Sequence, residues 1–492
     1  MKLPSQLKTL FTIFYVLGAL LFVEAGFMAL CCLPSFIDGE PQYGLIMLKC
    51  ALITAVVGFA LWFPFHGKPI DVDKRAGFLI VTLIWIVFSL FGSFPLLISG
   101  GVNTYLDAFF ETMSGFTATG SSIINDVESL PSSIGMWRII TQWIGGIGII
   151  VILLSLISFV SGGGMALYSA EVSGITKTKV APHIRQTSTI LIRTYLILTI
   201  FYCCVYFLSG MEIFDAICYA FTTVATAGLS PHNSSAAGFS PLIQWEMSVF
   251  MIFSGTNLLL FYFLIKGQFD ELKNNDELRT YLKIFIIAVI LIFILNFPQN
   301  ENISDGLRNS VFMTASLITS TGLINCDYIN WSSASIFVLV MLMIGGAMSG
   351  STSGGLKMVR MLLLFKNAKA TISRGLHSNA FIPVTLNGRL VEQRTLFNIF
   401  EVFILYVSVL VVGFLILIAT GVDGQEAFVS ALGALGNMGP GYTPIGSEVG
   451  SGMGNFAHFT PVGKLTMSFL MLVGRLELVT VFSIFTKTFW RR

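Results

Sequence analysis

Four short phrases rich in threonine and glycine recur along the chain at intervals of roughly 100 residues. They read FTATG (116–120), VATAG (224–228), ITSTG (318–322) and LGNMG (435–439). Glycine lacks a Cβ, so the backbone beside it can turn successive carbonyl groups toward one side, and threonine stiffens the chain and adds a hydroxyl oxygen. Four such strands around one axis can replace the hydration shell of a cation with carbonyl oxygens. The repetition therefore predicts an ion filter.

The residues expected to line this filter are the final positions of each phrase. They are Thr117, Ala118, Thr119, Gly120, Thr226, Ala227, Gly228, Thr319, Ser320, Thr321, Gly322, Asn437, Met438 and Gly439. None of the four phrases contains Asp or Glu, whereas divalent cations prefer carboxylate ligands. The phrases thus favour a monovalent cation, and we expect neither an organic cofactor nor any other metal.

An acidic residue followed by alanine lies ahead of three of the phrases, at Asp107, Asp215 and Glu426, while the third repeat has Asn309 at the equivalent place. Two interpretations stay open. These carboxylates enrich cations at the mouth of the pathway, or they are the N-caps of short helices.

The elements that position these phrases must lie in a membrane. The 492 residues are 54 % hydrophobic and only 11 % charged, with a mean hydropathy of +0.82, and stretches near the length of about 20 apolar residues that crosses a bilayer recur throughout. We expect ten spans, at about 9–33, 43–65, 77–99, 136–160, 188–209, 241–266, 282–297, 331–347, 395–420 and 463–488. The fold class is therefore an all-α polytopic membrane protein.

Positive charges follow a regular pattern between these spans. Most of the 28 lysines and arginines fall in the six segments that share one side of the membrane if the amino terminus lies there too. By the positive-inside rule, both termini are cytoplasmic. The exceptions are Lys49, Arg138, Arg308, Lys464 and Arg475.

Each phrase stands between two spans and follows an apolar stretch too short to cross a bilayer, which is typical of a re-entrant helix that returns as an extended strand. We expect an amino-terminal pair of helices (1–70) and four pore repeats. The repeats cover 71–175, 176–275, 276–390 and 391–492. Duplicated transporters without a carbonyl ring are the competing interpretation.

A second glycine-rich stretch, 345–357, interrupts the span that follows the third phrase. Because glycine costs about 1 kcal/mol relative to alanine inside a helix, we expect this stretch to unwind into a loop beneath the filter. Arg475 lies inside the last span, where a cation costs about 2.5–3.5 kcal/mol. We expect its partner to come from another repeat. Lys357 is either an anchor at a hinge of the loop or, as we prefer, a lysine at a helix end that extends toward the membrane surface.

Several motifs together resemble the Trk/Ktr/HKT superfamily of potassium transporters, most closely its TrkH-type translocating subunits. They are FGSFP (91–95), QWIGG (142–146), Thr321-Gly322 followed by Asp327 and Trp331, NMGPG (437–441) and GRLE (474–477). The resemblance covers nearly the whole chain. Glycine at all four filter positions implies, by this resemblance, potassium rather than sodium.

The resemblance also implies a gate, partners and a location. The gate would consist of Gly345, Gly346, Ser349, Gly350, Ser351, Thr352, Ser353, Gly354, Gly355, Lys357 and Arg475. Similar proteins are homodimers in the cytoplasmic (inner) membrane that work with a TrkA-type nucleotide-binding subunit, and the chain would contact lipid but no nucleic acid.

Two other functions were weighed against channel-like uptake. A potassium symporter coupled to H⁺ or Na⁺ needs an ionisable residue along the path, and Glu24, Glu111 and Glu477 are the acids to consider. A membrane enzyme is disfavoured because no HExxH pair occurs and the histidines fall on separate loops.

Overall fold

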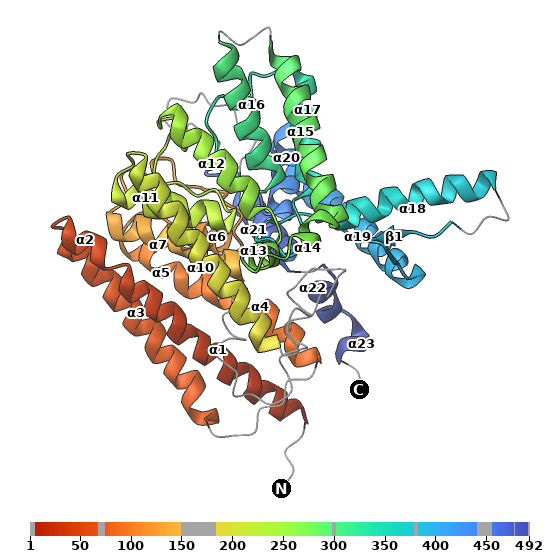
Figure 1. The fold of residues 1–492 in the computed structure, drawn as a ribbon. Coiled ribbons are helices and arrows are strands. Elements are labelled where there is room, and N and C mark those ends of the chain that lie inside the picture. Colours follow the sequence, from red (N-terminus) through yellow and green to blue (C-terminus); the bar gives the residue numbers. More distant parts are fainter. Residues whose placement is uncertain are drawn as a thin grey trace.

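The computed structural model describes residues 5–66, 74–148, 184–297, 302–377, 382–439, 455–476 and 478–490, and most of these residues are helical (Figure 1). Six helical segments are long and apolar enough to cross a membrane. Within the described residues, these segments are formed chiefly by α1 (Ser5–Leu30), α3 (Pro41–Trp62), α4 (Lys74–Gly92), α10 (Ile184–Leu208), α15 (Asp276–Asn296) and α19 (Gln393–Ala419). The span expected at 282–297 thus begins earlier, at Asp276.

Two of the expected spans are bent helix pairs. The first consists of α12 (Pro241–Ser254) and α13 (Leu258–Ile265), which differ in direction by 95°. The second consists of α21 (Pro461–Arg475) and α22 (Leu478–Ile484), at 117°. The first break has a local cause, since Asn257 caps the new helix by accepting a hydrogen bond from the Leu259 N–H at 2.9 Å.

The two remaining expected spans, 136–160 and 331–347, coincide only in part with described helices. The span at 136–160 begins with α7 (Ser132–Ile147), and its residues 149–160 lie outside the described part. The span at 331–347 is α17 (Ser333–Gly345), which ends at the start of the glycine-rich loop.

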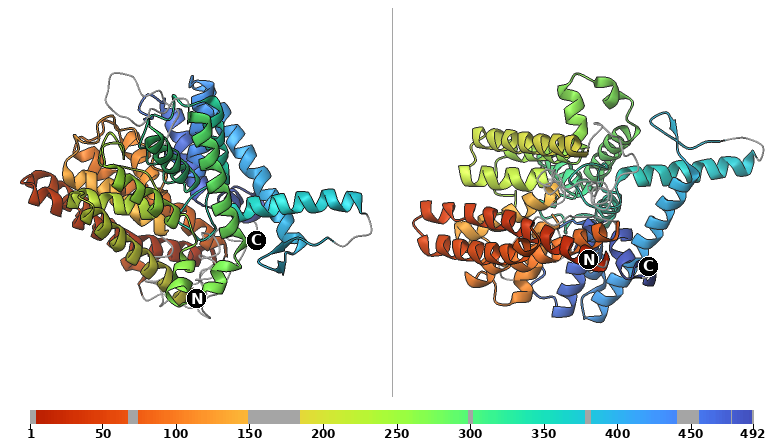
Figure 2. Two further views of the ribbon diagram at one scale, coloured as in Figure 1. Left: turned by 45° about the horizontal axis from the view of Figure 1, so that its top comes forward. Right: turned by 90° about the horizontal axis from the view of Figure 1, so that it is seen from below.

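Four short helices alternate with these spans: α6 (Tyr105–Phe116), α11 (Ile213–Ala225), α16 (Ile303–Ile318) and α20 (Gly424–Gly436). Each is shorter than a bilayer requires, and each is buried over its carboxyl-terminal half. Each of them ends at the first or second residue of one of the four phrases. Seen from below, the helices lie around a central region that holds loops of the middle repeats (Figure 2).

The first two long helices form a tight pair. A Cβ added at Gly18 of α1 would lie only 2.9 Å from the Cβ of Trp62, and one at Gly58 of α3 would lie 3.0 Å from the Gly18 carbonyl oxygen. Small residues permit this close approach of two helices. The pair packs through α1 against α4.

A helix and a hairpin extend away from the bundle (Figure 1). The helix is α18 (Met358–Leu376), and the hairpin pairs β1 (Thr385–Leu386) with β2 (Arg389–Leu390) across Asn387-Gly388. Both turn residues have positive φ, at 50° and 74°, as the two-residue hairpin turn requires. We call α18 and this hairpin the arm. The sequence analysis did not predict the hairpin.

The arm has a small core of its own, which includes Val359 and Leu363 of α18, Val384 and Leu386 of the hairpin and Ile399 of α19. The other described elements are short helices: α2 (Leu33–Ile37), η1 (Phe63–Phe65), α5 (Phe94–Ile98), α14 (Phe269–Lys273) and α23 (Lys487–Trp490).

Candidate ion pathway

The four phrases share an unusual backbone conformation at one position. In each, the residue two positions before the final glycine is left-handed although it is not glycine: Ala118 (φ 52°), Thr226 (52°), Ser320 (56°) and Asn437 (49°). Such residues are uncommon because the conformation crowds the Cβ. This strained conformation recurs at the same distance from the final glycine in all four phrases. The residues at equivalent positions in the four phrases are therefore those that the glycine spacing predicts.

The phrases also lie beside one another. A Cβ added at Gly120 would overlap the Ala227 carbonyl oxygen, one at Gly228 would overlap the Thr321 carbonyl oxygen, and one at Gly439 would come within 2.5 Å of the Gly120 carbonyl. These contacts give the spatial order of repeats as four, one, two and three. The carboxyl-terminal ends of α6, α11, α16 and α20, which carry the negative ends of the helix dipoles, meet at the same place.

Threonine hydroxyls brace two of the four phrases. The Thr117 Oγ1 and Thr119 Oγ1 atoms are 2.7 Å apart, and Thr319 Oγ1 and Thr321 Oγ1 are 2.8 Å apart. Thr117 and Thr319 also donate to carbonyls of their own helices, each at 2.6 Å. These hydroxyls fix the strand, so the oxygens left for an ion are chiefly backbone carbonyls.

The second and fourth phrases are held differently. Asn437 donates from Nδ2 to Thr119 Oγ1 at 3.1 Å and to the Met471 carbonyl at 2.8 Å. Thr226 Oγ1 lies 3.1 Å from Thr352 Oγ1 of the glycine-rich loop. The side chains at these positions therefore connect the filter to its surroundings.

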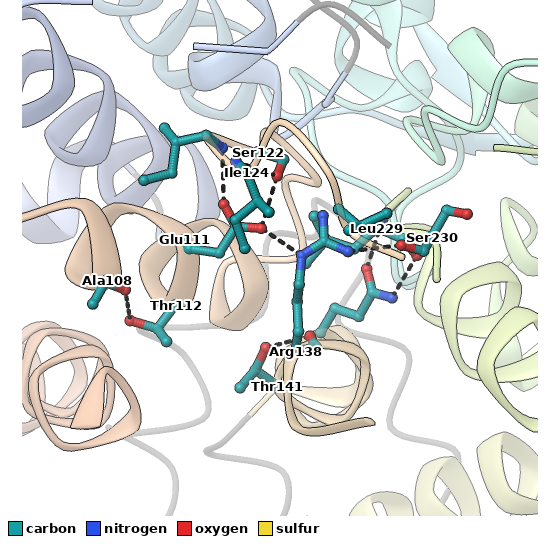
Figure 3. A network of polar contacts seen from close by, with 12 residues as sticks. Ala108, Glu111, Thr112, Ser122, Ile124, Arg138, Thr141, Leu229 and Ser230 are labelled. Atoms are coloured by element: carbon teal, nitrogen blue, oxygen red, sulfur yellow. Dashed lines mark hydrogen bonds and ion pairs between the residues drawn. The ribbon is translucent and has the colours of Figure 1, made fainter. Parts of the chain in front are cut away.

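A buried ion pair supports the first two phrases (Figure 3). Arg138 Nε of α7 donates to Glu111 Oε1 of α6 at 2.5 Å, and Arg138 Nη1 donates to the Ser230 carbonyl at 2.7 Å. Glu111 also accepts from the Ser122 hydroxyl and the Ile123 N–H, both at 2.9 Å. Glu111, considered above as a coupling acid, is thus engaged in an ion pair that joins repeat one to repeat two.

Gln142 of α7 makes a second connection of this kind. Its Nε2 donates to the Leu229 carbonyl at 3.1 Å, and its Oε1 accepts from the Leu229 N–H at 3.0 Å. The amide side chain therefore satisfies both backbone groups of the residue after Gly228. Sequence analysis noted Gln142 and Arg138 but gave neither this role, because the partners are about 90 residues away along the chain.

The glycine-rich stretch is a loop, as expected, between the end of α17 at Gly345 and the start of α18 at Met358. Its Gly354 N–H donates to Ser320 Oγ at 2.8 Å, and Thr352 Oγ1 donates to the Val224 carbonyl at 3.0 Å. A Cβ added at Gly354 would overlap the Gly436 carbonyl oxygen. The loop thus contacts the second, third and fourth filter regions directly.

The loop also fits into the break between α12 and α13. The Met348 N–H donates to the Gly255 carbonyl, and the Leu258 N–H donates to the Gly350 carbonyl, both at 3.1 Å. Gly350 has a φ of 77° and lies against the side chain of Asn257. The helix break and the loop therefore satisfy each other's backbone groups at membrane depth, which an exposed loop could not do.

Lys357 differs from the expectation that it reaches the membrane surface. Its side chain is buried and its Nζ donates to the Ser353 carbonyl, four residues earlier in the loop. The residue has a φ of 71°, which is unusual for lysine. The ammonium group therefore closes the loop on itself by binding one of the loop's own carbonyls.

Arg475 at the end of α21 connects the loop to repeat one. Its Nη1 donates to the Thr352 carbonyl at 2.8 Å, and its Nη2 donates to the carbonyls of Gly145 and Gly146 at 2.5 and 2.9 Å. Its guanidinium carbon also lies 5.9 Å from the centre of the Trp85 ring. The expectation that the partner of Arg475 comes from another repeat is confirmed by these three hydrogen bonds, all of which go to backbone carbonyls.

The residues ahead of the phrases lie in the short helices and have polar partners. Lys464 donates to Asp107 at 2.6 Å, His232 Nε2 lies 2.7 Å from Asp215, and His458 Nε2 lies 2.9 Å from Glu426. The third repeat has Asp305 in the first turn of α16, a residue that sequence analysis did not single out, and Asn309 accepts from the Asn325 amide at 3.0 Å. None of Asp107, Asp215 and Glu426 is itself the N-cap.

His232 lies between the carboxylates of Asp215 and Glu128. The hydrogen bond to Asp215, and to a smaller extent the interaction with Glu128, raises the pKa of His232 above its ordinary value of 6.5. A protonated imidazole here would neutralise part of the negative charge at the mouth of the pathway.

Glu24 and Glu477 are the other two acids considered for ion coupling. Glu24 of α1 is fully buried, and both of its carboxyl oxygens have no hydrogen-bond partner within the described residues. One of them lies 3.2 Å from the position of a Cβ added at Gly92 of α4. Glu477, Pro440 and Gly441 lie outside the described residues. Over those residues, no cluster of three or more His, Cys, Asp or Glu is placed to hold a metal.

Comparisons with known proteins agree with this architecture. Residues 46–491 match the TrkH family model, described as cation transport protein. The Trk system potassium uptake protein TrkH of Salmonella typhimurium is 34 % identical over 97 % of this chain and 98 % of its own. TrkG, a Trk system potassium uptake protein of Escherichia coli, is 33 % identical over 88 % of this chain and 89 % of its own.

A solved structure is similar over the same length. The crystal structure of the potassium transporter TrkH from Vibrio parahaemolyticus superimposes with a TM-score of 0.87 at 30 % identity, covering 98 % of this chain and 100 % of that one. The family transports cations and does not consist of enzymes, and its members carry the ion as cargo without a cofactor. The chain is a multi-pass membrane protein that belongs to the TrkH family of cation transport proteins.

Proposed function

We propose that the chain takes up potassium across the membrane through the centre of its four Thr/Gly phrases. The observation that carries this proposal is the repeated left-handed residue followed by glycine, in four phrases whose backbones touch in the order four, one, two and three. Such an arrangement supplies carbonyl oxygens without a carboxylate, which suits a dehydrated monovalent cation. The relatives named as potassium uptake proteins support the choice of ion.

The loop 345–357 and Arg475 form the closed gate in this proposal. The loop lies against three of the filter regions, and the arginine binds the loop at Thr352 while it is held by α7. A positive charge next to the pathway raises the barrier to a cation. Uptake then requires the loop to leave the Thr352–Arg475 contact, and flux is channel-like.

The filter assignment is tested by growth of a potassium-uptake-deficient host at low potassium. Gly120→Ser and Gly322→Ser introduce a Cβ at φ values of 85° and 79°, so we expect both to weaken rescue or to shift ion preference toward sodium. Gly135→Ser in α7 is the matched control, because a Cβ there meets nothing within 4 Å. Unchanged rescue and ion preference in both filter variants would contradict the assignment.

One observation favours a second candidate, a potassium symporter coupled to H⁺ or Na⁺. The buried Glu24 carboxyl has no partner within the described residues, and an unpaired acid at membrane depth is a possible proton carrier. Glu24 packs between α1 and α4 rather than in the filter phrases, so we prefer channel-like flux.

The remaining parts of the proposal concern assembly and location. We place the protein in the cytoplasmic membrane with both termini inside, because the positive charges gather on that side. The Trk system names of the relatives support association with other Trk subunits. We propose a homodimer that works with a TrkA-type regulatory subunit, which would meet the arm on the cytoplasmic side.

A further inference from the structure

Two adjacent acids at the start of α15 point to different parts of the molecule. Asp276 binds the arm, whereas Glu277 is buried and binds the glycine-rich loop. Adjacent residues on one helix turn share a backbone and move together. The arm and the loop are therefore attached to the same short segment.

Glu277 binds the glycine-rich loop at Ser349 and the first turn of α18 at Val359. Its Oε1 accepts from the Ser349 N–H at 2.6 Å and from the Val359 N–H at 3.1 Å, and its Oε2 accepts from the Ser349 hydroxyl at 3.0 Å. Ser349 lies ahead of the Thr352 contact with Arg475, and Val359 lies in the first turn of α18. The carboxylate thus caps α18 from outside, where the helix dipole favours a negative charge.

Asp276 holds the arm at two places. Its Oδ2 accepts from Lys366 Nζ of α18 at 2.8 Å and from the Asn387 N–H of the hairpin turn at 3.0 Å, while the Asp276 N–H donates to Asn387 Oδ1 at 2.8 Å. Val359, the residue whose N–H Glu277 accepts, belongs to the core of the arm together with Val384. Displacement of the hairpin would therefore act on both acids.

We propose that Asp276 and Glu277 couple the arm to the gate loop, with Glu277 as the residue that positions the loop in its closed conformation. The inference rests on the proposed function, since it needs the loop to be the gate. A force on the arm changes the position of α18 relative to α15. The three hydrogen bonds of Glu277 then weaken, and the loop is released.

The experiment measures Rb⁺ flux into liposomes that contain the purified full-length protein. Glu277→Ala leaves the Ser349 and Val359 N–H groups and the Ser349 hydroxyl without their acceptor. We therefore expect basal flux to rise by at least about tenfold, the ratio that the loss of one charge-assisted hydrogen bond produces. Glu277→Gln keeps one acceptor and should give a smaller rise. Glu271→Ala, on the exposed surface of α14, is the control and should leave flux unchanged.

The coupling itself is tested by combining variants. Lys366→Met removes the ion pair of Asp276 with the arm, and we expect a modest rise in flux that disappears in the Glu277→Ala background, because both changes act through one link. If Glu277 and Lys366 only stabilised the fold, their replacement would damage the protein and lower flux. A rise in flux therefore distinguishes control of the gate from a purely structural role.

Three results would overturn the proposal. Additive effects of Lys366→Met and Glu277→Ala would show that the arm and the loop are independent. Unchanged or reduced flux in both Glu277 variants, with Arg475→Ala raising flux, would refute the role of Glu277 but keep the gate. Unchanged flux in all of them would refute the gate assignment itself.

Discussion

Replacing Arg475 by alanine should open the pathway. In the structure its guanidinium binds the Thr352 carbonyl of the loop and the Gly145 and Gly146 carbonyls of α7. Opening breaks only the bond to the loop, because Gly145 and Gly146 belong to a helix that the proposed motion leaves in place. The bond to Thr352 therefore sets the magnitude.

A hydrogen bond from a charged donor contributes about 1.5–3 kcal/mol. Removal of this bond shifts the balance between closed and open loop by roughly 10-fold to 150-fold toward the open state, at about 1.4 kcal/mol for each factor of ten. Loss of the positive charge also lowers the barrier that a cation meets there. Both effects act in the same direction, so basal potassium flux should rise at least roughly 10-fold. The rise reaches its limit when most molecules are in the open state.

The assay is Rb⁺ uptake by proteoliposomes, with protein amount and monodispersity checked by size-exclusion chromatography. Arg475→Lys retains a charge but not the planar group that binds Thr352 and Gly145 together, so its flux should lie between those of the wild type and the alanine variant. If Arg475→Ala is folded and its flux equals the wild-type value, the gate described above is wrong.

The remaining predictions concern the filter, its support and its mouth. Gly228→Ala places a Cβ at a φ of 95° and into a neighbouring carbonyl oxygen, at a cost of about 1–2 kcal/mol for the conformation alone, and growth at low potassium should fail. Arg138→Met leaves the buried Glu111 carboxylate unpaired and should lower the free energy of unfolding by about 3–5 kcal/mol, which thermal unfolding in detergent measures; an unchanged melting temperature would contradict this. Because folding raises the pKa of His232 above 6.5, its stabilising effect is complete below pH 6.5 and is lost as the pH rises through the raised pKa. His232→Gln should remove that part of the pH dependence of thermal stability. Glu24→Gln, a neutral replacement for a carboxyl without a partner in the described part of the chain, should leave uptake intact, whereas abolished uptake would favour the symporter.

The sequence predicted those parts of the pathway that depend on local chemistry. Glycine spacing located the phrases, and the glycine-rich composition of 345–357 indicated a loop where hydropathy alone indicates a helix. Asn387-Gly388 is a local hairpin signal of the same kind, because this dipeptide favours the two-residue turn between β1 and β2. Each of these features depends on a few neighbouring residues.

Other features depend on contacts between distant segments and have no local signal. The left-handed conformation at Ala118 and at Asn437 is imposed by the packing of the phrases, since alanine has no preference for it. Glu277 looks like an ordinary acid at a helix start until the fold brings Ser349 beside it. The inward turn of Lys357 likewise depends on loop carbonyls that only the folded chain presents.

The threonine pairs of the first and third phrases have a consequence for the shape of the filter. In the order four, one, two, three, the phrases with Thr117 and Thr319 face each other across the centre, and Thr226 and Asn437 belong to the other diagonal. In the proposed filter, an ion would therefore meet two braced walls along one diameter. Along the other it would meet one wall tied to the glycine-rich loop at Thr352 and one tied to α21 at Met471. The four phrases around the ion would then have two-fold rather than four-fold symmetry. Discrimination by ionic radius would be strict along one direction and compliant along the other.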